Sequence, residues 1–272
     1  MQATSISDHE FSQFQRFIYD AAGITLGAAK KALVGGRLAK RIQHCELDSY
    51  GDYLRLLASG TAPDEVQMAV DLLTTNETYF FREPKHFEFL RQTATAATGA
   101  LPYRVWSAAS SSGEEPYSIA MVLADCLNGR PWEVIGSDIS SRVLQRARTG
   151  HYPLERTDHI PPQYLKRFCL RGTGNHEGTL LIERSLRSRV QFTQVNLNET
   201  LPKMGDFDII FLRNVMIYFN ADTKRQVIAR ILAMLKPGGF FLVGHSETLN
   251  DLTTAVKLVA PSIYRKPPRA PL

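Results

Sequence analysis

Cysteine is scarce in this sequence, with three among 272 residues. Cys45, Cys126 and Cys169 lie far apart, and their odd number argues against a disulfide framework, while no paired spacing suggests a zinc site. No apolar run reaches the roughly 18 residues that a membrane-spanning helix needs, and the first ten residues are too polar for a signal peptide. We expect a protein of the cytoplasm, with no direct membrane insertion and no bound metal.

The composition is that of a globular protein. Hydrophobic residues make up 44% of the chain and charged residues 22%, which excludes wholesale disorder, and the length allows one large domain or two smaller ones. The 32 basic side chains outnumber the 27 acidic ones, for a net charge of +5. This excess makes an acidic partner plausible, but it does not choose between a nucleic acid, an acidic protein and ordinary surface chemistry.

The first 73 residues predict a helical domain. Ser7 and Glu10 have the spacing of a capping box, phenylalanines then recur at helical intervals, and Gly23 is a natural stop. Further helices are predicted over residues 28–44, 49–58 and 63–73.

A basic stripe lies on the second of these helices. Its members follow i, i+3, i+4, i+7 spacing and are Arg37, Lys40, Arg41 and His44. From the residues alone it is either a solvated helix face or a docking surface for an acidic partner.

From residue 101 onward, short β-rich runs alternate with amphipathic helices. This alternation predicts an α/β fold with a parallel sheet covered by helices on both faces. Between 166 and 190 two β-like runs flank the glycine-rich stretch Gly172–Gly178, which predicts a small inserted antiparallel hairpin. The expected strands are 104–107, 133–137, 190–195, 208–212 and 240–244, and the expected helices are 116–127, 140–149 and 222–235, the last ending at the stop signal Lys236–Gly239.

Ligands of open α/β sheets bind outside the carboxyl ends of the strands. The loop after the first strand contains neither G-x-G-x-x-G nor a P-loop, and Glu114 and Glu115 stand where phosphates would bind. A nucleoside that carries positive charge fits better, and S-adenosylmethionine is such a ligand. Asp138 suits a pair of ribose hydroxyls, or it merely caps the next helix. Residues 74–84 read, without further information, as a packed linker.

Several long motifs resemble the CheR family of chemotaxis receptor methyltransferases. They are Thr74-Thr75-Asn76-x-Thr78-x-Phe80-Phe81-Arg82-Glu83, Trp106–Ala109 with Gly113–Ser118, Arg213–Phe219, Lys236–Gly239 and Gly244–Glu247. The resemblance covers the chain to about Arg265. It implies a Rossmann-like methyltransferase domain over 101–272 with a β-subdomain at about 166–190, a helical receptor-docking domain over 1–73, and a linker over 74–100 that contributes to the cofactor site.

The resemblance also implies an activity. S-adenosylmethionine would methylate glutamate side chains on the acidic cytoplasmic helices of bacterial chemoreceptors, leaving S-adenosylhomocysteine, at receptor arrays that recruit the protein. A C-terminal receptor peptide would bind the β-subdomain as a tether, and the basic stripe would dock on the receptor. Arg82 and Tyr218 would orient the acceptor carboxylate, although Tyr218 could equally pack under the sheet, and His245 is expected to be structural. The implied cofactor contacts are Asn76, Thr78, Arg82, Glu115, Asp138, Asn196, Leu197, Arg213 and Asn214.

Three rival interpretations are weaker. A methyltransferase acting on nucleic acid or a small molecule would fit the basic charge, but there is no interleaving of basic and aromatic residues that would grip bases. A receptor-docking sensor without catalysis would be expected to lack Arg82 or Tyr218, and both are present. A dehydrogenase lacks its glycine fingerprint.

Overall fold

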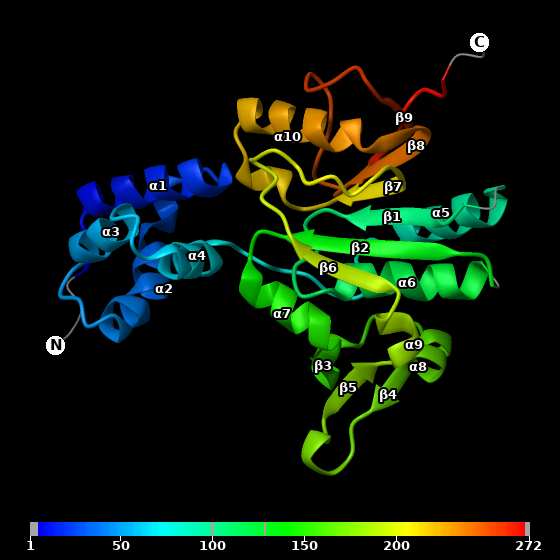
Figure 1. Cartoon of the computed structure of the whole chain (residues 1–272), viewed down its shortest axis with the longest axis horizontal. Coiled ribbons are helices and arrows are strands. Elements are labelled where there is room, and N and C mark those ends of the chain that lie inside the picture. Colours follow the sequence, from blue (N-terminus) through cyan, green and yellow to red (C-terminus); the bar gives the residue numbers. More distant parts are fainter. Residues whose placement is uncertain (1–4, 99–100, 128, 270–272) are drawn as a thin grey trace.

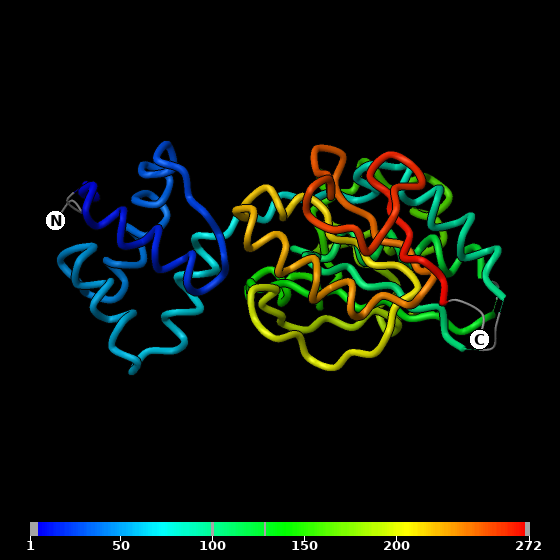
Figure 2. Tube along the Cα trace, turned by 90° about the horizontal axis from the view of Figure 1, so that it is seen from above, coloured from blue at the N-terminus to red at the C-terminus, as the bar shows by residue number. Residues whose placement is uncertain are grey.

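The computed structural model describes residues 5–98, 101–127 and 129–269. They form two lobes joined side by side, a helical N-terminal lobe and a larger α/β lobe (Figure 2). Within the described ranges no helix has the length and apolar character that crossing a membrane requires.

The N-terminal lobe confirms the predicted helices. They are α1 (Asp8–Ala22), α2 (Lys31–His44) after a short 3-10 turn η1 (Ala28–Lys30), α3 (Tyr50–Ala58) and α4 (Pro63–Leu73). The capping box forms at Ser7 and Glu10, and Gly23 ends α1 at a φ of 71°, a conformation that glycine adopts without strain. The helices pack around side chains with no exposed surface, among them Phe14, Ile18 and Tyr53.

The α/β lobe is built on a seven-stranded sheet of order β6-β2-β1-β7-β8-β10-β9 (Figure 1). The five strands from β6 to β8 are parallel, as predicted, and β10 and β9 add an antiparallel edge that the pattern did not predict. β8 begins five residues before the predicted strand, because Leu235 already pairs with Phe207; the register then shifts over Lys236–Gly239 before pairing resumes between Ile209 and Phe240. The strands are β1 (Tyr103–Ser107), β2 (Trp132–Asp138), β6 (Val190–Gln194), β7 (Phe207–Leu212), β8 (Leu235–Val243), β9 (Lys257–Ala260) and β10 (Ile263–Arg265).

Helices cover both faces of the sheet. Alternate strand residues enter two separate cores, so Trp106 and Ile210 pack with α10 (Ala221–Ala233), whereas Val105 and Ile209 pack with α5 (Pro84–Ala96) and α6 (Glu114–Cys126). α7 (Ser141–Thr149) lies against β2 and β6. The segment predicted as a linker over 74–100 contains α5, which the sequence pattern did not predict; Pro84 at its first position and the buried Phe87 and Leu90 favour this helix.

A small antiparallel sheet of order β3-β5-β4 projects below the main sheet (Figure 1). The predicted hairpin is present as β4 (Cys169–Arg171) and β5 (Thr179–Ile182). The insert is larger than the expected 166–190, because β3 (His151–Pro153) pairs with the other edge of β5. Two helices, α8 (Pro162–Phe168) and α9 (Arg184–Arg187), flank the hairpin.

Candidate active site

A cleft opens at the carboxyl ends of β1, β2 and β7, where the two lobes meet. It encloses about 850 Å³ of space, part of it open solvent. Ala22 and Ile24 of the N-terminal lobe line one side, a contribution that the sequence pattern did not reveal. The structure brings all nine predicted cofactor contacts and Tyr218 to this cleft: Asn76, Thr78, Arg82, Glu115, Asp138, Asn196, Leu197, Arg213, Asn214 and Tyr218.

The lobes are held together by polar contacts beside the cleft. The buried Asp71 at the end of α4 accepts hydrogen bonds from the backbone of Ser141 and Arg142 at the start of α7. The backbone N–H of Thr25 donates to the carbonyl of Tyr218 at 2.8 Å. Asn196 also contributes, since its amide donates to the carbonyl of Ala21 at 2.7 Å, so its side chain fastens the lobes together at the rim of the cleft.

Asp138 lies at the end of β2 with 8% of its surface exposed. Its two oxygens accept hydrogen bonds from the backbone N–H groups of Ser111 and Ser140. The side chain of Ser140, not that of Asp138, caps α7. Burial raises the pKa of Asp138 to about 6, because the two backbone hydrogen bonds do not fully offset the lost hydration. Further hydrogen-bond donors, such as ribose hydroxyls, would therefore stabilise the ionised carboxylate.

The N-terminus of α6 carries carboxylates rather than a phosphate-binding loop. Glu114 is fully buried, accepts a hydrogen bond from Ser112 and pairs with Arg156 at 2.6 Å. Glu115 accepts a hydrogen bond from Ser107 at 2.7 Å and lines the cleft. Of the two carboxylates only Glu115 lines the cleft, where it disfavours a diphosphate and favours a ligand with a cationic end. The sulfonium and amino group of S-adenosylmethionine supply that charge, and Asp138 can receive its ribose.

A buried guanidinium joins the walls of the cleft. The Arg213 side chain is 1% exposed and pairs with Glu83 and Glu115, each at 2.9 Å. It also donates to the carbonyl of Arg82 at 2.5 Å. Burial raises the pKa of Glu115, and Arg213 opposes this rise. Glu83 does not itself line the cleft but pairs with Arg213, which does, and the sequence reasoning missed this role. Its signal in the sequence was its place directly after Arg82 in a motif quoted for the family.

The two candidate acceptor-orienting side chains reach the same cleft. Arg82 donates to the carbonyl of Glu77 at 3.1 Å, and its guanidinium lies 5.7 Å from the centre of the Tyr79 ring. Tyr218 ends the short turn η4 (Met216–Tyr218), is half-buried and lines the cleft, so it does not pack entirely under the sheet.

The predicted basic stripe does not form one free surface. Arg41 pairs with the buried Glu65, which also accepts a hydrogen bond from Tyr53 at 2.6 Å. Arg37 donates to the carbonyls that end α4, with the one to Thr74 at 3.0 Å. The spacing placed all four side chains on one helix face but did not reveal that this face partly meets α4. Lys40 and His44 are the exposed members of the stripe.

A parallel sheet with a ribose-suited carboxylate after β2, and carboxylates in place of a phosphate loop, defines the class of S-adenosylmethionine-dependent methyltransferases. Comparison with known proteins is more specific. Residues 9–74 match the CheR methyltransferase all-alpha domain, and residues 76–264 match the CheR methyltransferase SAM binding domain. The chain belongs to the CheR methyltransferase family, and S-adenosylmethionine is its cofactor.

Similar proteins match along nearly their whole length. The chemotaxis protein methyltransferase of Salmonella typhimurium is 42% identical over 266 residues, covering 97% of this chain and 92% of that protein. The one of Escherichia coli is 43% identical over 265 residues, covering 96% and 91%. Chemotaxis protein methyltransferase 2 of Pseudomonas aeruginosa is 41% identical over 259 residues, covering 94% and 92%.

Proposed function

We propose that this methyltransferase esterifies glutamate side chains on the cytoplasmic helices of bacterial chemoreceptors. The main support for the proposal is that Arg82 and Tyr218 line the same cleft as the other predicted cofactor contacts. The names of the related chemotaxis methyltransferases support the choice of receptors as substrate. Transfer of a base-labile methyl label from S-adenosylmethionine to receptor membranes tests it, and cofactor binding without such label would favour a sensor instead.

Methyl transfer requires little of the protein beyond alignment of the acceptor carboxylate with the methyl group. The cofactor supplies an electrophilic methyl group on a sulfonium. A glutamate carboxylate, with a reference pKa near 4.3, is already ionised at neutral pH, so no side chain has to remove a proton. Arg82 would bind the carboxylate through a charge-assisted hydrogen bond and Tyr218 through its hydroxyl, while the two lobes exclude water. Because opposite charges neutralise in the transition state, these groups act best by orientation.

Cofactor affinity is expected to fall as the pH drops below about 6. Ribose hydroxyls donate to the ionised form of Asp138, whose pKa in the free protein is raised to about 6, so binding at lower pH must release a proton. Affinity should therefore fall by roughly tenfold per pH unit below that point. Calorimetric titration between pH 5 and 8 measures it. An Asp138→Asn variant should bind more weakly at pH 8 and lose the slope; an unchanged slope would exclude Asp138 as its source.

Docking on the receptor is proposed for the exposed end of the basic stripe. Lys40→Glu should raise KM for receptor and flatten its rise with added salt, because an exposed positive charge attracts the acidic helices. Arg41→Ala should instead lower the stability of the helical lobe, since it leaves Glu65 buried without its cation. Steady-state kinetics and thermal unfolding of both variants separate the two effects. A larger KM change in Arg41→Ala at unchanged stability would contradict this assignment.

A receptor tether is proposed for the free edge of β4. In the described part of the chain β4 pairs only with β5, and Leu170 on it is 53% exposed. An extended receptor peptide would add a strand there, which raises the local receptor concentration. Calorimetric titration with a C-terminal receptor peptide ending in an aromatic residue should give saturable heat. The same peptide with that residue changed to serine is the control, and no heat from either would exclude the tether.

A further inference from the structure

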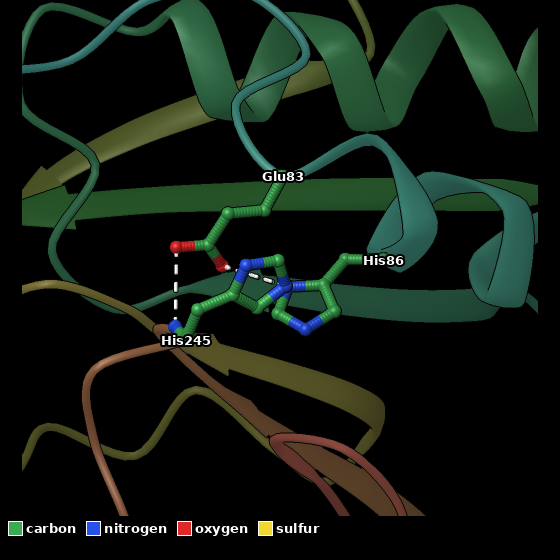
Figure 3. Close-up of side chains that lie close together, drawn as sticks. All are labelled: Glu83, His86 and His245. Carbon is green, nitrogen blue, oxygen red and sulfur yellow. Dashed lines mark hydrogen bonds and ion pairs between the residues drawn. The ribbon is translucent and has the colours of Figure 1, made fainter.

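Three potential metal ligands meet outside the cofactor cleft. Glu83 stands just before α5, His86 lies in the first turn of α5, and His245 follows β8 (Figure 3). One ligand atom from each lies within 4.8 Å of the other two. The Glu83 Oε2 atom lies 3.3 Å from His86 Nδ1 and 3.8 Å from His245 Nε2. Ligands about 2.0–2.1 Å from a tetrahedral zinc ion are separated by about 3.3–3.4 Å, so two of the atoms already stand close to ligand spacing.

The buried histidine has an unpartnered nitrogen that faces this cluster. His86 is 1% exposed, and its Nδ1 has no hydrogen-bond partner among the described residues. Its other ring nitrogen, Nε2, lies 3.1 Å from the hydroxyl of Ser262. Metal-bound histidines usually donate their second ring nitrogen to such an outer partner, which leaves the first with its lone pair toward the ion. A buried polar atom without a partner is costly, and a cation bound at Nδ1 would satisfy it.

Charge around the cluster is compatible with a cation. The Arg213 guanidinium faces two carboxylates, Glu83 and Glu115, so one negative charge is uncompensated when both are ionised. Arg213 and the backbone N–H of His245 each bond one oxygen of Glu83 and hold the carboxylate in place. The Oε1 atom accepts one hydrogen bond and keeps a lone pair that can bind a metal, whereas Oε2 already contacts both Nη2 and Nε of Arg213, at 2.9 and 3.3 Å.

The cluster is also reachable from solvent. His86, His245 and Ser262 line a surface groove, and neither Glu83 nor the two histidines line the cofactor cleft. The His245 side chain is 52% exposed, which leaves it room to swing toward the other two ligands and leaves space for water as a fourth ligand. We propose that Glu83, His86 and His245 form a binding site for Zn²⁺ beside the cofactor cleft. This site stands independently of which protein the enzyme methylates.

Zinc binding by the full chain without a histidine tag tests the proposal. Calorimetric titration with Zn²⁺ should show one saturable equivalent, and Co²⁺ at the same site should give the visible absorption of a tetrahedral ion. His245→Ala removes a ligand from an exposed position, so the fold should survive, and the affinity should fall by more than about 100-fold. Ser262→Ala removes only the outer partner of His86 and should weaken zinc by about tenfold.

A second histidine pair provides the matched control. His151 on β3 and His176 in the turn between β4 and β5 are both exposed, with ring centres 5.5 Å apart. His176→Ala should leave the zinc affinity unchanged. The proposal is overturned if no saturable equivalent binds, if His245→Ala leaves the affinity unchanged, or if His176→Ala abolishes binding.

Discussion

Arg82→Ala is expected to lower methyl transfer to receptor by about 100-fold in kcat/KM, because a misoriented acceptor loses the in-line geometry on which the reaction depends. Arg82 lines the cleft, and among the described residues its side chain makes one hydrogen bond, to the carbonyl of Glu77, so its removal leaves no buried charge unpaired. Steady-state transfer of labelled methyl to receptor membranes measures the loss.

The matched variant is Arg82→Lys, which keeps the charge but loses the planar fork. It should recover only part of the activity, because lysine offers a point charge rather than two parallel donors. Thermal unfolding of both variants should stay close to that of the parent protein. Full activity of Arg82→Ala at saturating receptor would contradict the orienting role.

Arg213→Met should lower the free energy of unfolding by about 3–5 kcal/mol, because it leaves two buried carboxylates without their cation. Glu83 and Glu115 are 11% and 13% exposed, so water replaces the guanidinium only in part. The loss should shrink as the pH falls, since protonation removes the unpaired charges, and Glu115 already has a raised pKa. Urea unfolding at pH 7.5 and pH 5 measures both effects.

A surface pair gives the control for Arg213. Arg225 and Asp222 lie 3.0 Å apart on α10, with 50% and 82% of their side chains exposed. Arg225→Met should change the free energy of unfolding by less than about 1 kcal/mol. Equal losses in the two variants would mean that Arg213 is no more than a surface ion pair.

Local sequence patterns predicted most of the fold. The capping box at Ser7 and the stop at Gly23 depend on only a few neighbouring residues, so the sequence shows them directly. The five parallel strands are short apolar runs between turn signals. The sequence did not predict α5, because its residues follow an unusual polar and aromatic stretch that is typical of a loop. The sequence did not predict the edge strands β9 and β10, because the exposed β9 carries no alternating pattern and its pairing with β10 depends on tertiary contacts.

The candidate site was predictable where topology forces residues together. Asp138 ends β2 and Arg213 follows β7, two parallel strands that flank β1, so the carboxyl-end rule brings them to one edge of the sheet. The roles of Arg37, Arg41 and Asn196 were not predictable, because their partners lie on segments distant in sequence: the end of α4, Glu65 and Ala21. The His245 cluster was missed for the same reason, since α5 and β8 meet only in the folded chain.

The most direct measurement is transfer of labelled methyl from S-adenosylmethionine to membranes that contain chemoreceptors, followed by mild base. The proposed function predicts label on the receptor that base releases as methanol, as a carboxyl methyl ester requires, and its near loss in Arg82→Ala. Receptor label that resists base would contradict glutamate esterification. Cofactor binding without label on any receptor of the same cell would contradict receptor methylation altogether.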